Sequence, residues 1–493
     1  MRRFSLLAAL LTLPLAGALA PSASAARTAT LPAFESCSEL VRFGRAAAVR
    51  PPVPMRATGA GFYGIGSLIL PRAIRPEPKP VPPGQLPPDG IAVPVSAMPS
   101  TSPEAFDAVD DVQATEEFSG TNVQEDGIDE PDAIKTDGKR LFVVVGAELW
   151  AYDVTGAAPK LLSKLSLEGA GGEILLFGDR VLVLGPQPAA AAVGSRTQTA
   201  DTPGAVAPVP VSLPAPSVTD AMVVAPQEQT TRLAEVDARN PAAMKIVRTM
   251  AVPGTVVSAR LTRGSIRVVM SSPAALPGAA TASAAATRSG AAPKPTMRTF
   301  VPRTTLRSRR TKRTFRRYLV PCDNVRHPVA ISGSDLLTIL TVDFKDGLFN
   351  VDRDAVMAGA QVVYASASSL YVASTRAIEI DAPADIPRKM VTEIHRFDTT
   401  KDGETSYLGS GTVPGFALDQ YALSEHGGDL RVATTEVPNW LPGAERVESQ
   451  SHVTVLRPAG PGAAPLRQIG QVSGLGPGEQ IYATRFIDDR AYV

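Results

Sequence analysis

The chain is poor in the residues that most metal and nucleophilic sites require. It contains two cysteines and four histidines. The histidines are scattered, without the HExxH or paired spacing of a zinc site, so we expect them to be solvated turn residues. No GxSxG nucleophile elbow occurs. These absences exclude the simplest metalloprotease and serine hydrolase motifs. A formal net charge of +1 likewise excludes a global positive field that would attract nucleic acid.

Long apolar runs are also missing after the N-terminus. The first 25 residues combine a basic start (MRRF), an apolar run interrupted by Pro14 and the small-residue pattern Ala23-Ser24-Ala25, which together are typical of a secretory signal peptide. We expect cleavage after Ala25 and a secreted, periplasmic or cell-surface protein with no transmembrane anchor. The alternative, an N-terminal membrane anchor, needs roughly 20 uninterrupted apolar residues, and this run is shorter.

The two cysteines are Cys37 and Cys322. In an oxidising compartment an isolated pair most simply forms one disulfide, which predicts a bridge from the segment after the signal peptide to the middle of the chain. Closing so long a loop restricts the unfolded chain, which stabilises the folded state, and strain reduces that gain. The alternative is two buried free thiols.

Proline and glycine, in contrast, are abundant, with 45 and 40 residues. This composition disfavours long helices and favours short elements joined by turns, so we expect an all-β fold. The exception is ESCSELVRFGRAAAV (35–49), where an apolar stripe and Ser36 as N-cap predict one helix. With a proline-rich arm and an acidic linker, this helix makes up a predicted N-terminal region, 26–120.

Residues 121–493 form the predicted main domain, with two low-complexity inserts, 186–229 and 274–315, that we expect to be disordered. Outside them, β-branched runs recur, most of them directly after Gly or Asp turns, at a spacing of about 40 to 60 residues once the inserts are removed, which is the size of a β-propeller blade. Nothing follows the last run, so we expect an arc of blades that is incomplete at the C-terminus. The runs are LFVVV (141–145), RVLVLG (180–185), SIRVVM (265–270), SLYVAS (369–374), DLRVAT (429–434) and RAYV (490–493).

Three segments carry a resemblance to a known family. They are TNVQEDGIDEPDAIKTDGKRLFVV (121–144), YLVPCDNVRHP (318–328) and YALSEHGGDLRVATT (421–435). They resemble a family of exported bacterial proteins with a C-terminal β-propeller domain, distantly similar to WD-repeat propellers. The resemblance implies the fold and export, but no reaction or catalytic residue.

An acidic stretch precedes the first strand. Residues 104–137 hold twelve Asp or Glu and one Lys. Four of these carboxylates lie within seven positions around Gly127, a density of hard oxygen ligands that could hold calcium, although the spacing is not that of an EF-hand loop. We favour the other interpretation, in which Asp126 and Asp129 accept backbone N–H bonds in the turn before the first strand. The four calcium candidates are Asp126, Asp129, Glu130 and Asp132.

A basic stretch, 298–317, contains nine Arg or Lys and no acid. For an exported protein it indicates contact with a protein or an anionic cell-envelope polymer, whereas the alternative is a solvated loop. We therefore expect a non-enzymatic binding or scaffolding propeller that uses charged loops, needs no cofactor and has no nucleic-acid partner. The alternative function is a metal-dependent hydrolase or lyase with its site in the propeller funnel.

Overall fold

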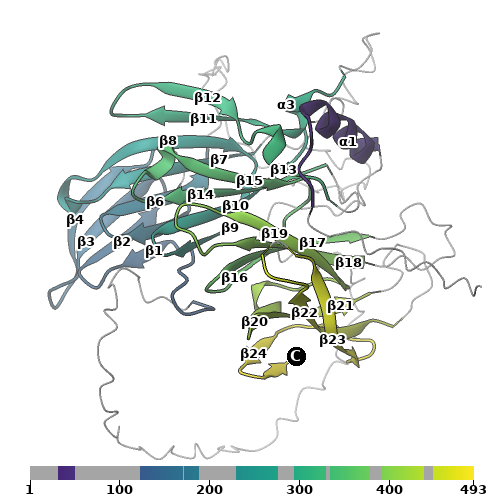
Figure 1. The fold of residues 1–493 in the computed structure, drawn as a ribbon. Coiled ribbons are helices and arrows are strands. Elements are labelled where there is room, and N and C mark those ends of the chain that lie inside the picture. The colour runs from purple at the N-terminus through teal and green to yellow at the C-terminus, as the bar shows by residue number, and fades with distance from the viewer. Residues whose placement is uncertain are drawn as a thin grey trace, which may run out of the picture.

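The computed structural model describes residues 31–49, 123–169, 171–187, 229–275, 294–328, 334–377, 390–437, 448–462 and 464–493. The predicted signal peptide and proline-rich arm lie outside these residues. The described chain is mostly antiparallel strands, which confirms the all-β prediction, and its sheets follow one another in an arc (Figure 1). No helix of this described part is long and apolar enough to cross a membrane.

Sheets 1 and 2 come first along the chain. Sheet 1 is a four-stranded meander, and sheet 2 has four consecutive strands plus an outer hairpin, β11–β12, contributed from later in the sequence. The strands of sheet 1 are β1 (Ile134–Thr136), β2 (Arg140–Val145), β3 (Glu148–Asp153) and β4 (Lys160–Ser166). Those of sheet 2 are β5 (Glu173–Phe177), β6 (Arg180–Pro186), β7 (Thr230–Asp237), β8 (Lys245–Pro253), β11 (Arg303–Ser308) and β12 (Thr314–Tyr318).

Sheets 3 and 4 form the middle of the arc. In sheet 3 the outermost strand, β13, pairs in parallel with β15, and all other pairs are antiparallel. The strands of sheet 3 are β9 (Thr255–Thr262), β10 (Ser265–Ser272), β14 (Leu336–Asp343), β15 (Val351–Val356) and β13 (Val325–Arg326). Those of sheet 4 are β16 (Val362–Ala365), β17 (Ser369–Ala377), β18 (Met390–Asp398) and β19 (Ser406–Pro414).

Sheet 5 and a final hairpin complete the described strands. Within the described residues β24 and β25 pair only with each other, and no strand pairing joins them to β1–β4. In sheet 5 the turn Gly427-Gly428 has two positive φ angles, 59° and 85°, which suits a two-residue hairpin. The strands are β20 (Leu423–His426), β21 (Asp429–Glu436), β22 (Gln450–Pro458), β23 (Leu466–Leu475), β24 (Arg485–Ile487) and β25 (Arg490–Tyr492).

The six β-branched runs found in the sequence form β2, β6, β10, β17, β21 and β25, each of which is the second strand of its sheet. Most residues of β6, β10, β17 and β21 are buried between neighbouring elements, whereas β2 is largely half-buried and β25 is exposed. In β10, Ile266 and Val268 belong to the core shared with sheet 2, and Val269 belongs to the core shared with sheet 4. Each such fully buried side chain contributes about 1.5–3 kcal/mol.

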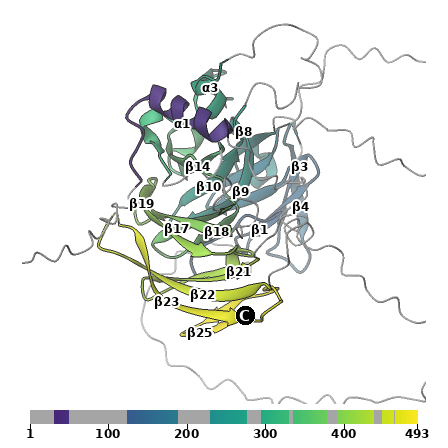
Figure 2. The same cartoon turned by 90° about the vertical axis from the view of Figure 1, so that its right-hand side faces the viewer.

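The described helices are short and lie together beside the outer strands of sheets 2 and 3 (Figures 1 and 2). Helix α1 packs Leu40 into the core, and Gly44 lies so close to the Phe300 ring of α3 that an added Cβ would be 2.7 Å from it. The two α-helices are α1 (Cys37–Val49) and α3 (Met297–Phe300); the 3-10 turns are η1 (Pro241–Ala243), η2 (Cys322–Asn324), η3 (Gly347–Phe349) and η4 (Gln420–Ala422).

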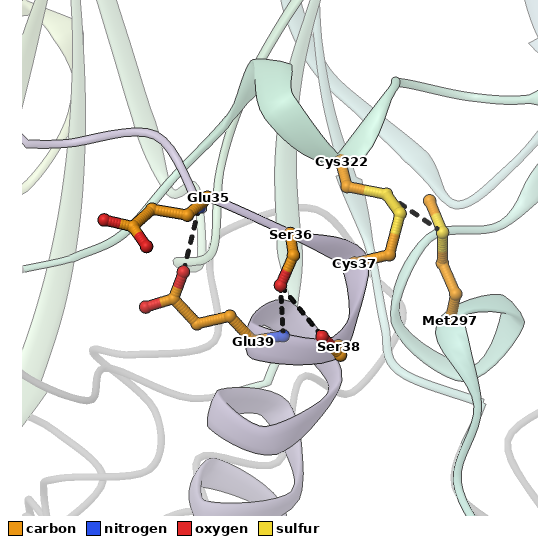
Figure 3. The surroundings of a disulfide bond; sticks show 7 residues. All are labelled: Glu35, Ser36, Cys37, Ser38, Glu39, Met297 and Cys322. Atoms are coloured by element: carbon orange, nitrogen blue, oxygen red, sulfur yellow. Dashed lines mark hydrogen bonds between the residues drawn. A yellow bond between two sulfur atoms is a disulfide. The ribbon is translucent and has the colours of Figure 1, made fainter.

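The disulfide prediction is confirmed. Cys37, at the first residue of α1, is bonded to Cys322 in η2, with Cα atoms 5.2 Å apart (Figure 3). Ser36 caps the helix as expected, because its Oγ accepts the Glu39 N–H at 3.2 Å. The bridge therefore fastens α1 to the chain segment that carries α3 and the β11–β12 hairpin.

The prediction of a disordered insert at 274–315 is wrong for residues 294–315. These residues form α3, β11 and part of β12, and the hairpin extends sheet 2 by pairing β11 with β8. Arg303–Ser308 alternates exposed cations with buried Thr304, Leu306 and Ser308, which is a half-buried strand pattern that arginine-rich composition obscured. The Ala-rich part, 276–293, and most of the first insert, 188–228, lie outside the described residues.

Candidate functional site

The acidic segment before the first strand lies along the inner strands of the sheets. Residues 123–133, called here the axial segment, contact an inner element of every sheet from 5 to 2 before the chain enters β1. The amide nitrogen of Gln124 donates to the carbonyls of Gln420 and Leu423 at the start of sheet 5, at 3.1 and 3.0 Å. Farther along, Asp129 pairs with Leu261 of β9 through two 2.9 Å backbone bonds. The segment therefore ties the inner strands of the sheets together.

The axial segment makes its contact with sheet 4 through Glu125. The Tyr364 hydroxyl donates to Glu125 Oε1 at 2.6 Å and accepts the Glu425 N–H at 2.7 Å. Glu425 in turn accepts the Tyr371 hydroxyl at 2.6 Å. Burial raises the pKa of the Glu125 carboxyl, Tyr364 counteracts the rise, and the charge of Glu425 adds to it. Two carboxylates therefore share a cluster of tyrosine hydroxyls between sheets 4 and 5.

Three of the four calcium candidates make hydrogen bonds or ion pairs within the protein. Asp129 is buried and accepts the Lys135 ammonium at 2.6 Å and the Glu130 N–H at 3.0 Å. Asp132 accepts the Ala133 N–H at 2.6 Å, and its backbone pairs with Ile174 of β5. Asp126 is exposed. Among the described residues no group of three or more His, Cys, Asp or Glu side chains is arranged to hold a metal. Calcium binding stays an untested hypothesis; of the two expected turn acceptors Asp129 accepts a backbone N–H, and so does Asp132, which was not named for that role.

Glu130 lies against residues that sequence reasoning missed. The Arg260 guanidinium is buried, lies 3.6 Å from Glu130 Oε1 and donates to Gln420 Oε1 at 2.7 Å. Gln420 Nε2 donates back to Glu130 at 3.1 Å. These partners are separated by more than 100 residues in sequence, so no local motif indicates them. The one available sequence clue is that a dense acidic segment requires buried cations to accompany it.

The histidines are not the solvated turn residues that the sequence suggested. His395 on β18 is completely buried, and its two ring nitrogens have no hydrogen-bond partner within the described residues. Burial lowers the pKa of its imidazole, and the charge of Glu393 counteracts that effect. His452 on β22 is also buried and contacts Glu436 at 3.2 Å. Only His426 fits the expectation, because it is exposed at a hairpin turn.

The basic stretch forms the outermost surface of sheet 2. β12 is the edge strand of that sheet, and all five of its residues are exposed. Figure 1 shows the β11–β12 hairpin at the periphery of the molecule, far from the inner edge where the axial segment runs. The exposed cations of the hairpin, called here the basic hairpin, are Arg303, Arg307, Arg310, Lys312, Arg313, Arg316 and Arg317.

The strand register sorts these side chains onto two faces. On one face Arg303 lies opposite Tyr318, and Arg316 lies opposite Thr305. The Arg303 guanidinium is 5.8 Å from the centre of the Tyr318 ring. On the other face Phe315 lies opposite Leu306, so it neighbours the buried side of the hairpin. Both faces of β12 therefore combine a cation with an exposed aromatic ring.

The second aromatic group spans two elements. Phe315 meets Phe349 of η3 edge to face, with ring centres 6.2 Å apart, and both rings are exposed. Arg317, on the same face of β12, carries a pKa lowered by burial. It also lies near enough to Arg353 of β15 for its charge to lower the Arg353 pKa, second to burial. The charge of Asp352 counteracts both effects on Arg353.

The charge of the basic hairpin is uncompensated. Arg309 at the turn pairs with Glu168, whereas none of the seven exposed cations has an ion-pair partner in the described part of the chain. The buried carboxylate of Glu235 on β7 is already bound by Arg180 and Arg248 at 2.5 and 2.8 Å. An exposed surface whose seven cations have no ion-pair partner among the described residues is an electrostatic attractor for an anionic ligand.

Comparison with known proteins agrees with this architecture. One curated relative, an uncharacterized protein of Methanocaldococcus jannaschii, is 37% identical over 84 residues, which cover 17% of this chain and 12% of that protein. The chain thus matches only a small part of the length of that relative. A family model described as "Beta propeller domain" matches residues 118–493, which include the axial segment and every described strand. On that match, the chain belongs to the beta propeller domain family.

Proposed function

We propose that the protein is a non-enzymatic binding module that captures an anionic macromolecule through the basic hairpin. One observation carries the proposal: seven exposed cations lie on a single edge hairpin and have no ion pair among the described residues. Six of the seven are arginines, whose planar guanidinium group can donate two parallel hydrogen bonds to a carboxylate, phosphate or sulfate.

The fastening of the hairpin supports a binding role. β11 pairs with β8 through four residues, and the Thr304 hydroxyl donates to the Ala251 carbonyl at 2.9 Å. The Cys37–Cys322 disulfide holds the chain just beyond the hairpin. A surface held in one conformation loses less entropy when it binds, which favours affinity.

The carboxylates of the axial segment, where the alternative places an enzyme's site in the propeller funnel, favour that alternative less. Asp129 and Glu130 are engaged by Lys135, Arg260 and Gln420 in the native contacts. A catalytic carboxylate needs to reach a substrate, whereas these groups hold inner strands together.

Export fits the same proposal. The N-terminal 25 residues have the features of a signal peptide, and the disulfide is of the kind that persists in an oxidising compartment. In such a compartment the hairpin meets acidic proteins and anionic envelope polymers.

Binding of anionic polymers to the purified protein tests the proposal. We expect dextran sulfate and poly-glutamate to bind, uncharged dextran not to bind, and the affinity to fall as salt rises. The triple variant Arg303→Glu, Arg307→Glu, Arg316→Glu should bind at least about tenfold more weakly. The control Lys401→Glu changes a cation with 72% side-chain exposure in the turn between β18 and β19 of sheet 4 and should bind like the wild type. Equal binding by the triple variant and the wild type would contradict the proposal.

A further inference from the structure

We infer that the edge of β12 is a docking site for an extended acidic polypeptide, which adds to sheet 2 as a further antiparallel or parallel strand. This inference rests on the proposed function and deepens it, because it names the partner class and the mode of binding. It follows from three features of β12: a free backbone edge, cations on both faces, and an exposed aromatic pair beside them.

The backbone edge of β12 is free. The strand order of sheet 2 places β12 at its end, with β11 on one side and no described strand on the other. Its outward N–H and C=O groups therefore have no strand partner in the described part of the chain. The Arg316 carbonyl accepts one long side-chain bond, 3.4 Å from the Arg303 guanidinium. A row of groups without a strand partner is a template for strand addition, in which main-chain hydrogen bonds supply affinity.

The side chains of β12 specify the charge of the incoming strand. Successive residues of a strand point to opposite faces, so Arg316 and Arg317 present one cation on each face. A strand added beside them places its own side chains within about 4.5–5.5 Å of these positions, where opposite charges stabilise the pair. Acidic residues on both faces of the partner are therefore favoured.

The aromatic pair specifies one apolar position. Phe315 lies between Thr314 and Arg316 in sequence and meets Phe349 across 6.2 Å. Phe349 is 58% exposed, although it is a large apolar side chain. A partner residue opposite Phe315 would lie against the exposed Phe315 ring, where an aliphatic side chain buries apolar surface. The preferred partner therefore carries acidic residues on both faces and a Val or Leu opposite Phe315.

A second copy of this chain is excluded as the occupant by the same charges. Pairing β12 with β12 would place Arg316 and Arg317 of one copy among the cations of the other, and like charges directly opposite each other destabilise a sheet. Cationic edge strands are a known device against edge-to-edge association. The β12 edge is therefore unsuited to pairing with β12 of a second copy and suited to pairing with an acidic strand.

An anionic polysaccharide satisfies fewer of these features. It offers sulfates or carboxylates to the guanidinium groups, but it has no alternating N–H and C=O groups to pair with the free edge of β12. A peptide meets the charge and the backbone together, and this distinction decides the experiment.

The test uses the peptide acetyl-TEEVTEEVT-amide and the same peptide with every backbone amide N-methylated. N-methylation keeps the charge and removes the donors that strand pairing needs. We expect the unmodified peptide to bind at least about tenfold more tightly than the methylated one, since several main-chain bonds are lost. Hydrogen exchange of the Thr314–Tyr318 amides should slow when the unmodified peptide binds. The variants Arg317→Glu and Phe315→Ser should weaken binding, and Lys401→Glu should not.

The outcomes separate this inference from the proposed function. If both peptides bind equally and the β12 amides exchange at an unchanged rate, strand addition is wrong although anion capture stands. If dextran sulfate binds and neither peptide does, the partner is a polysaccharide and the inference is overturned. If no anionic probe binds, the proposed function fails as well. Circular dichroism of each variant confirms that it is folded.

Discussion

Removal of the Cys37–Cys322 disulfide is the perturbation whose cost can be derived most directly. The bridge closes a loop with a sequence separation of 285 residues, and the loop-entropy relation gives about 5.6 kcal/mol of stabilisation at 25 °C. The variant Cys37→Ser, Cys322→Ser deletes the bridge with little change in side-chain size. It should lower the free energy of unfolding by about 3 to 6 kcal/mol, because native-state strain reduces the ideal value.

The change in melting temperature follows from the size of the domain. For residues 118–493, an unfolding entropy of about 2.1 cal/mol/K per residue gives about 0.8 kcal/mol/K in total, so a loss of 5.6 kcal/mol corresponds to about 7 °C. Thermal unfolding followed by circular dichroism measures this shift. The wild type with a reducing agent should melt like the double variant, and the double variant should not respond to the reducing agent.

A control separates the bridge from the helix that it holds. Ser36→Ala removes the N-cap of α1 but leaves the bridge, and it should cost about 1 kcal/mol. Without the bridge, trypsin should cleave sooner after Arg42 or Arg45, which lie on α1. If mass spectrometry shows an intact disulfide in the wild type and yet the double variant melts within 1 °C of it, the loop-entropy reasoning is refuted.

Two further perturbations test buried charge and buried imidazole. Glu235→Ala leaves the Arg248 guanidinium without its carboxylate partner and should destabilise the protein by about 3–5 kcal/mol in urea unfolding. The control Glu404→Ala, in an exposed ion pair, should change stability by at most about 0.5 kcal/mol. Similar losses in the two variants would show that burial does not set the cost of removing the carboxylate. The imidazole of His395 has a lowered pKa in the folded state, so on acidification the unfolded state binds a proton that the folded state does not. Its contribution to stability is therefore complete above the unfolded pKa of about 6.5. Below that pH the free energy of unfolding falls by up to about 1.4 kcal/mol per pH unit. His395→Leu should lose this acid sensitivity, and the exposed control His426→Gln should keep it. Urea unfolding at pH 7 and pH 5 measures the difference. Equal acid sensitivity in the wild type and both variants would count against the role of His395.

Most of the repeated framework could be predicted from local sequence. Runs such as RVLVLG and DLRVAT follow Gly or Asp turns and contain β-branched residues, so they indicate strand and turn without reference to distant residues. They form the second strands of their sheets, where most of their residues are buried. The helix at Cys37–Val49 was also predictable, since its cap and its apolar stripe lie within one short segment.

The basic hairpin was predicted only in part. The sequence showed its charge, but the composition of 274–315 suggested disorder, whereas Leu306 and Thr304 anchor β11 on β8. Whether a strand forms there depends on a partner, β8, that lies about 50 residues earlier. Local propensity cannot supply that information, because sheet pairing is a long-range contact.

The sequence by itself therefore determined the fold class, the second strand of each sheet and the one disulfide, because each depends on nearest neighbours or on a pair with no competitor. Tertiary structure alone decided the path of the axial segment, where Glu125 meets Tyr364 and Asp129 meets Leu261. It also decided that β12 is an edge with free cations on both faces. The axial contacts join residues more than 100 positions apart, and the hairpin is placed by β8, about 50 residues earlier. Backbone pairing between distant segments has no short-range signature in the chain.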